Sequence, residues 1–204
     1  MKPELAHHLE KARATVAEVE RIVDLHEYPD DQRTVMVRGF LATMILHHRS
    51  ILLLIRSGIV GSAYALARDI IRGTSDGLWI NSCATSDQIL RLQKDYDFVL
   101  SIPEINKEIE AAYKDDPFFV ELRDHWAATL YRYTRERIAL VGQFHIHPKS
   151  GLEHEDEEGN VVTITTLCIV LLASKFLATQ KHADDSKKVE ALAAAYAKER
   201  RAGQ

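Results

Sequence analysis

Residues 161–178 read VVTITTLCIVLLASKFLA and form the most continuously apolar stretch of the chain. Three threonines, Ser174 and Lys175 interrupt this run. A membrane-spanning helix needs about 20 predominantly apolar residues, whereas a shorter helix that is apolar on all sides is typical of a protein core. We therefore predict a buried central helix from Val161 to Gln180 and no membrane association.

Two amphipathic helices are predicted before it, over residues 3–25 and 31–57, with Asp30 or Asp31 as the N-cap of the second. Each repeats apolar residues in alternating steps of four and three, which suits packing against one neighbouring helix or against a second copy of the chain. The two series are Leu5, Leu9, Ala12, Val16, Val19 and Val23, and Val37, Leu41, Met44, His48, Ile51 and Ile55. The run ILLLI at 51–55 is apolar on all sides and predicts that this end of the second helix is central.

Further helices are expected over residues 60–83, after Thr85, around residues 105–113, from residue 117 onward, and over residues 184–200. The segment 142–160 has no hydrophobic period and is predicted to be a loop, and no alternating strand pattern is found. The expected fold is an all-α, single-domain bundle of six to eight helices over residues 1–204. Residues 1–28 and 184–204 are candidates for peripheral helices.

The composition is that of a globular protein, with 46% hydrophobic and 27% charged residues. The net charge of −4 argues against a protein that coats DNA, because such proteins neutralise phosphates with an excess of cations. Cys83 and Cys168 are the two cysteines, and we expect both to be reduced and buried. The N-terminal residues lack the apolar segment of a signal peptide, so a cytoplasmic location is expected.

A charged stripe marks the helix predicted over residues 60–83. Arg68, Arg72 and Asp76 are four residues apart and share one face, and Trp79 follows one turn later. One interpretation is an internal ion pair between Arg72 and Asp76, with Arg68 paired elsewhere. The other is a site for an anion or phosphate, because the guanidinium group offers a planar fork to such ligands. His48, on the apolar series of the preceding helix, is expected to be a core histidine or a member of this site.

Two glycines, Gly73 and Gly77, lie within the same predicted helix. Each costs about 1 kcal/mol relative to alanine in a helix interior. Glycines retained at this cost usually permit a close approach of helices or a kink.

Three histidines of the segment 142–160 are candidate metal ligands. His145, His147 and His154 stand beside several acidic residues, and imidazole and carboxylate groups are ligands of divalent metals. Their spacing matches no helical metal-binding pair, so a solvated acidic segment is the competing interpretation. No cofactor is expected.

The segment 67–80, ARDIIRGTSDGLWI, followed by Cys-Ala-Thr at 83–85, resembles a block in uncharacterised bacterial helical proteins. These proteins are distantly similar to HEPN helical bundles, several of which are metal-independent RNases of toxin or phage-defence systems. Arg72 stands where those proteins have an acid, and Asp76 stands where they have arginine. The resemblance implies RNA as a substrate, with His145 as general acid or base and Arg137 as the phosphate-binding residue. Seven residues separate Arg137 from His145, compared with four to six in active HEPN proteins.

Three functions therefore remain open from the sequence. The first is a bacterial helical protein that acts by binding a partner and forms a homodimer. The second is the HEPN-like RNase with Arg137 and His145, and the third is a metal-dependent hydrolase with His145, His147 and His154.

Overall fold

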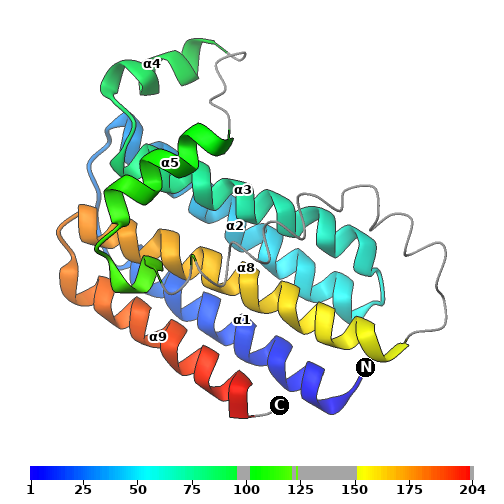
Figure 1. Cartoon of the computed structure of the whole chain (residues 1–204). Coiled ribbons are helices and arrows are strands. Elements are labelled where there is room, and N and C mark those ends of the chain that lie inside the picture. The colour runs from blue at the N-terminus through cyan, green and yellow to red at the C-terminus, as the bar shows by residue number, and fades with distance from the viewer. Residues whose placement is uncertain (96–101, 121–122, 124–150, 203–204) are drawn as a thin grey trace.

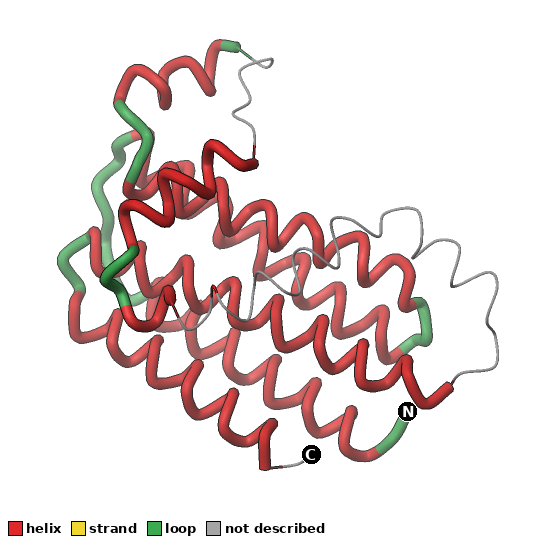
Figure 2. The backbone as a smooth tube through the Cα atoms, viewed as in Figure 1, coloured by secondary structure: helices red, strands yellow, loops and turns green. Residues whose placement is uncertain are grey.

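A computed structural model describes residues 1–95, 102–120, 123 and 151–202, and the side chains of most of them. The described residues contain helices and no strand, which confirms the prediction of an all-α bundle (Figure 2). The helices are α1 (Pro3–Asp24), α2 (Gln32–Arg56), α3 (Val60–Ser82), α4 (Ser86–Lys94), α5 (Ile102–Tyr113), α8 (Gly151–Thr179) and α9 (Ala183–Ala202).

Helix α8 is the centre of the bundle. It packs against α1, α2, α3 and α9, and the long helices lie side by side in Figure 1. Ile169, Val170 and Leu172 on α8 are fully buried, as are the interrupting residues Thr165 and Thr166. The hydroxyl groups of both threonines donate hydrogen bonds to carbonyl oxygens of the preceding turn, so their burial leaves no donor unpaired. The predicted buried central helix is confirmed.

The first turns of α8 correct the sequence prediction of a loop over residues 142–160. Helix α8 begins at Gly151, so the prediction is wrong for residues 151–160. Residues 142–150 lie outside the described part of the chain. The acidic run EHEDEE at 153–158 shows no apolar period, but glutamate is a good helix former. Extending a helix that is already formed adds a hydrogen bond with each residue, which favours this continuation.

Local capping residues set the ends of the other helices. The Asp31 carboxylate accepts a hydrogen bond from the Thr34 backbone amide at 3.0 Å, which selects Asp31 over Asp30 as the N-cap of α2. Thr85 and Gln88 form a reciprocal capping box at the start of α4. Gly58, just beyond α2, has a φ of +73°, a conformation that glycine adopts at low cost.

Both predicted apolar series are used inside the single chain. Every member of the series on α1 and on α2 is buried, with α1 packed on α8 and α9, and α2 packed on α3 and α8. These two stripes are therefore not the surface on which a second copy could dock. The prediction that residues 51–55 are central is wrong at Leu53, whose exposed fraction is 65%. Leu53 lies on the face of α2 that points away from α3 and α8.

One of the two glycines of α3, Gly77, permits a close helix contact, as predicted. A Cβ atom at Gly77 would lie 2.6 Å from Cδ2 of Leu172 on α8, which is a steric clash. A Cβ atom at Gly73 would lie 3.5 Å from side-chain atoms of Met44 and Phe40 on α2, which is ordinary contact. Gly77 therefore sets how closely α3 approaches the central helix.

Replacing Gly77 with alanine is expected to lower the free energy of unfolding by about 1 kcal/mol. Overpacking of a core costs about 1–3 kcal/mol, and the better helix propensity of alanine returns about 1 kcal/mol. Gly61→Ala is the matched control, because a Cβ atom at Gly61 meets nothing within 4 Å. Chemical denaturation monitored by circular dichroism measures both variants, and an equal gain of stability in the two would contradict the role of Gly77.

The two cysteines are free thiols. Cys168 is buried, and this burial raises the pKa of its thiol to about 12. A hydrogen bond with the Thr74 side chain acts in the opposite direction. Cys83 is only half-buried, which corrects the expectation that both are buried, and desolvation raises the pKa of its thiol to about 11. Neither thiol has the lowered pKa of a reactive cysteine.

Two described helical segments are long and apolar enough to cross a membrane, judged by length and composition alone. The segment Glu158–Thr179 of α8 is 78% buried inside the molecule, as expected of a core helix. The corresponding window of α2 is only 39% buried. Helix α2 thus combines high hydropathy with an exposed face.

Candidate functional site

The charged stripe of α3 contains the predicted ion pair. Nε of Arg72 lies 2.7 Å from Oδ2 of Asp76, and 34% and 23% of the two side chains are exposed. Burial raises the pKa of Asp76 above its usual value, and the hydrogen bond from Arg72 acts in the opposite direction. The guanidinium group of Arg72 is therefore already engaged by a carboxylate of its own helix.

The two ends of the charged stripe of α3 lie in different surroundings. Arg68 is exposed to solvent, whereas Trp79 is 2% exposed beneath α5. The indole Nε1 of Trp79 donates a hydrogen bond to Oε2 of Glu108 at 2.6 Å. Trp79 thus fastens α5 to α3, and the stripe changes from a surface feature to a helix contact along its length.

His48 has the geometry of a core histidine. Its side chain is fully buried, and Nε2 lies 2.9 Å from Oγ1 of Thr166 on α8. Burial, with a smaller contribution from Arg49, lowers the pKa of His48 to about 3, so the ring is neutral at pH 7. Nδ1 has no hydrogen-bond partner among the described residues. The hydrogen bond of His48 connects it to the central helix rather than to Arg72 or Asp76.

A buried cation on α8 forms a cluster that the sequence reasoning missed. Lys175 is 5% exposed, and its Nζ lies 2.6 Å from Oδ2 of Asp116 and 2.9 Å from Oε1 of Glu190. The Phe118 ring lies 5.3 Å from the same Nζ, and the Ser174 hydroxyl donates to Glu190 at 2.7 Å. The sequence signal was a lysine inside an apolar run. The cluster ties α8 to α9 and to the segment that follows α5.

The structure does not describe the side chains of the residues proposed for RNA cleavage and metal binding. Arg137, His145 and His147 lie outside the described residues, and His154 lies in α8 with a side chain that is not described. Within the described part of the chain, no group of three or more His, Cys, Asp or Glu side chains could hold a metal ion.

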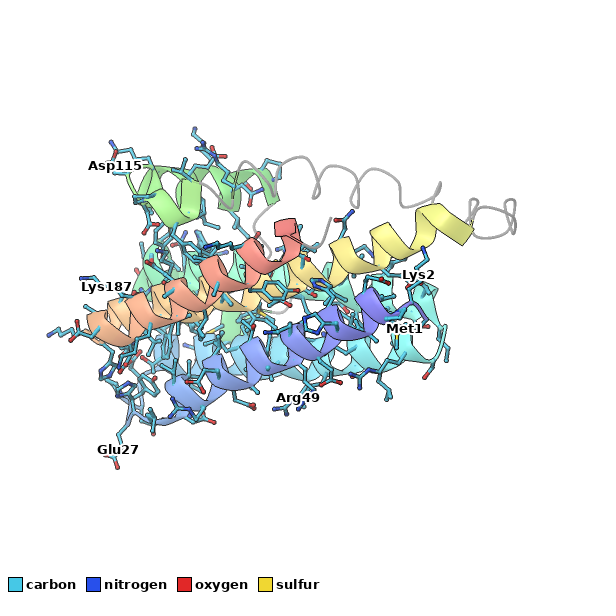
Figure 3. The ribbon with its side chains drawn as sticks, turned by 90° about the horizontal axis from the view of Figure 1, so that it is seen from below. Met1, Lys2, Glu27, Arg49, Asp115 and Lys187 are labelled. Carbon is cyan, nitrogen blue, oxygen red and sulfur yellow. The ribbon has the colours of Figure 1, made fainter. Side chains whose placement is uncertain are left out.

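The solvent-facing side of α2 carries a second series, apolar except for Arg49, which we name the α2 outer stripe: Val35, Gly39, Ala42, Leu46, Arg49 and Leu53. Val35 is 51% exposed, Leu46 59% and Leu53 65%. The stripe follows the same four-three spacing as the buried series and is displaced from it by two residues. Two residues correspond to about 200° around a helix, so the two series occupy opposite faces. Figure 3 shows Arg49 on the outside of the bundle, opposite Asp115.

Gly39 lies in the middle of this exposed stripe. A Cβ atom there would meet nothing within 4 Å, in contrast to the crowded surroundings of Gly77. A glycine in a helix interior costs about 1 kcal/mol relative to alanine, and no contact of the described chain requires this one.

The neighbours of the stripe define its electrical character. Arg49 and Arg56 are hydrogen-bonded to Glu20 and Glu10 of α1, respectively. Arg38 lies 5.3 Å from the centre of the Tyr28 ring in a cation–π contact. Arg49, the charged member of the stripe, and the neighbouring Arg38 and Arg56 thus all have partners within the chain, and the other members of the stripe are uncharged.

Comparisons of the chain with known protein families, curated proteins and solved structures found no match.

Proposed function

We propose that this chain is a non-catalytic helical interaction protein that binds a partner helix on the α2 outer stripe. The exposure of Leu46, Leu53 and Val35 in one helical line carries this proposal. Single exposed leucines are ordinary on protein surfaces, but a contiguous apolar patch on a soluble domain commonly marks an interaction site.

The stripe offers apolar side chains that a partner could bury. Covering three half-exposed aliphatic side chains contributes about 3 kcal/mol, because full burial of each is worth about 1.5–3 kcal/mol. Gly39 and Ala42 allow a partner backbone to come close between the larger side chains. The surroundings of Arg72, Trp79 and Lys175 point to structure instead, because each of the three side chains is hydrogen-bonded to a carboxylate.

A photo-crosslinking amino acid tests this binding surface. We expect p-benzoylphenylalanine at position 46 to give a discrete adduct larger than the 23.1 kDa chain when irradiated in cells that make the protein. The same probe at Ala191, an exposed position of α9, is the matched control and should give no such adduct. Helix α9 packs on α8 and α1, so a probe there leaves the α2 outer stripe intact.

Two outcomes would contradict the proposal. One is the absence of an adduct at position 46, or the same adducts at positions 46 and 191. The other is cleavage of RNA by the purified protein that is abolished by His145→Ala, which would favour the HEPN-like RNase instead.

A further inference from the structure

We propose that the stacked rings of His26 and His182 form an acid-sensitive clasp at one end of the bundle. Near neutral pH the clasp holds the turn between α8 and α9 on the connection between α1 and α2. When both rings are protonated, the two segments separate. This device lies away from the α2 outer stripe and does not depend on the partner proposed there.

The two rings come from segments that are far apart in the sequence. His26 lies in the connection between α1 and α2, and His182 lies in the turn between α8 and α9. The ring centres are 3.7 Å apart and the ring planes are inclined by 16°, so the imidazoles are stacked face to face. Figure 3 shows Glu27 and Lys187, which flank these segments, at the same end of the bundle. The stack is therefore a direct contact between two loops.

Tyr28 joins this stack to the core. Its ring stands edge-on to both imidazoles, with centres 6.1 Å from His26 and 5.9 Å from His182. It also packs against Phe176 of α8 at 4.9 Å, and Phe176 is fully buried. Separation of the two loops thus weakens the aromatic cover of a core side chain.

The first proton on the histidine pair has a counter-ion within reach. Nε2 of His26 lies 2.9 Å from Oδ2 of Asp185, and the two side chains are only 20% and 19% exposed. A second proton places another positive charge on a ring stacked at 3.7 Å. Like charges at this distance repel strongly where little water screens them. Histidine is the side chain that changes charge in the weakly acidic range, so this repulsion develops on mild acidification.

The other charges around the clasp do not absorb the second proton. Asp185 is already shared, because Lys188 also donates a hydrogen bond to its carboxylate. Hydrogen bonds from Lys188 and His26 hold the pKa of Asp185 below its usual value, so it stays ionised at mildly acidic pH. The neighbouring cations are Arg21, Arg38, Lys181 and Lys188, and the neighbouring anions are Asp24, Glu27, Asp184 and Asp185. These charges balance while both rings are neutral, so each proton adds net positive charge.

The turn that carries His182 has a strained backbone. Lys181 has a φ of +67°, a conformation that favours glycine. The backbone amide of His182 donates to the Leu177 carbonyl at 2.8 Å, which ends α8 at this turn. Beyond the stack, the Gln180 side chain donates to the Thr34 hydroxyl at 3.2 Å. A strained turn held by few contacts opens locally, without unfolding of the bundle.

Hydrogen exchange of backbone amides, measured by NMR at pH 7 and pH 5 and corrected for intrinsic rates, tests the clasp. The amides of His182 and Ser186 report the turn, because they donate to the carbonyls of Leu177 and His182. His182→Phe keeps a ring over His26 but cannot be protonated. Between pH 7 and pH 5, the wild type should lose about tenfold more protection at these amides than this variant. The contribution of His48 is present in both proteins and cancels in the comparison.

His7→Phe is the matched control, because His7 is exposed on α1, and it should behave as the wild type. An equal loss of protection in the wild type and His182→Phe would overturn the clasp, as would a His7→Phe variant that behaves like His182→Phe. Asp185→Asn gives a second test that does not alter the stack. Without this carboxylate, protection at the turn should start to fall at a higher pH, and an unchanged profile would also contradict the clasp. None of these substitutions touches the α2 outer stripe, so the adduct at position 46 should persist in each.

Discussion

Replacing Lys175 with methionine is expected to lower the free energy of unfolding by about 3 kcal/mol, the loss typical when one partner of a buried ion pair is removed. Methionine fills much of the same volume, so the loss reports the missing charge rather than a cavity. The Asp116 and Glu190 carboxylates are only 27% and 31% exposed, and without the ammonium group they repel each other across a poorly hydrated space. Urea denaturation, with the midpoint and slope fitted together, measures the change.

Lys188→Met is the matched control for this variant. Lys188 forms an ion pair with Asp185 three residues earlier, but its side chain is 66% exposed, so the loss should be far smaller than that of Lys175→Met. A triple variant that joins Lys175→Met to Asp116→Asn and Glu190→Gln should recover part of the stability, because it removes the unpaired charges. A loss below 1 kcal/mol for Lys175→Met would show that the cluster does not hold α8, α9 and the segment after α5 together.

The second large effect is expected from pH, through His48. Its pKa is lowered to about 3 in the folded protein by burial, compared with 6.5 in an exposed histidine. Below pH 6.5 the unfolded chain binds a proton at this ring that the folded chain does not bind. The free energy of unfolding therefore falls as the pH falls from 6.5 towards 3, by about 1.4 kcal/mol for each pH unit. Between pH 7 and pH 5 the contribution of His48 amounts to about 2 kcal/mol.

A comparison with His48→Gln isolates this contribution from that of the other histidines. Glutamine retains a polar group near the Thr166 hydroxyl but does not titrate. The stability of the variant should depend less on pH between 7 and 5, by about 2 kcal/mol, although its stability at pH 7 is also reduced by imperfect packing. Parallel pH profiles for the two proteins would mean that the folded protein accommodates a protonated ring at position 48.

The helices themselves could be predicted well because their signals are local. The apolar run of α8, the Asp31 cap and the glycine beyond α2 each act over a few residues. The start of α8 was predicted too late because the acidic residues 153–158 have no apolar partner to mark their period. There the helix is favoured by propensity and by continuity with the packed segment, neither of which appears as a hydrophobic pattern.

The candidate sites were harder to predict because their members come from distant parts of the chain. The pairing of Arg72 with Asp76 was predictable, since both lie on one turn of one helix. The partners of Lys175 are 59 residues before it and 15 residues after it, and no spacing rule connects them. The catalytic roles of Arg137 and His145 stay predictions, because both residues lie outside the described part of the chain.

The sequence by itself predicted that α2 is a helix with one apolar series in four-three spacing and a run at 51–55 that is apolar on all sides. Only the tertiary structure decided the role of each face. Helices α3 and α8 cover the series that contains Met44, Ile51 and Ile55, whose larger side chains fill the core. The series with Gly39 and Ala42 is left to solvent, because its small residues leave less apolar area for intramolecular packing to bury. Long-range packing thus separated a core stripe from an exposed stripe, on which we propose that a partner binds.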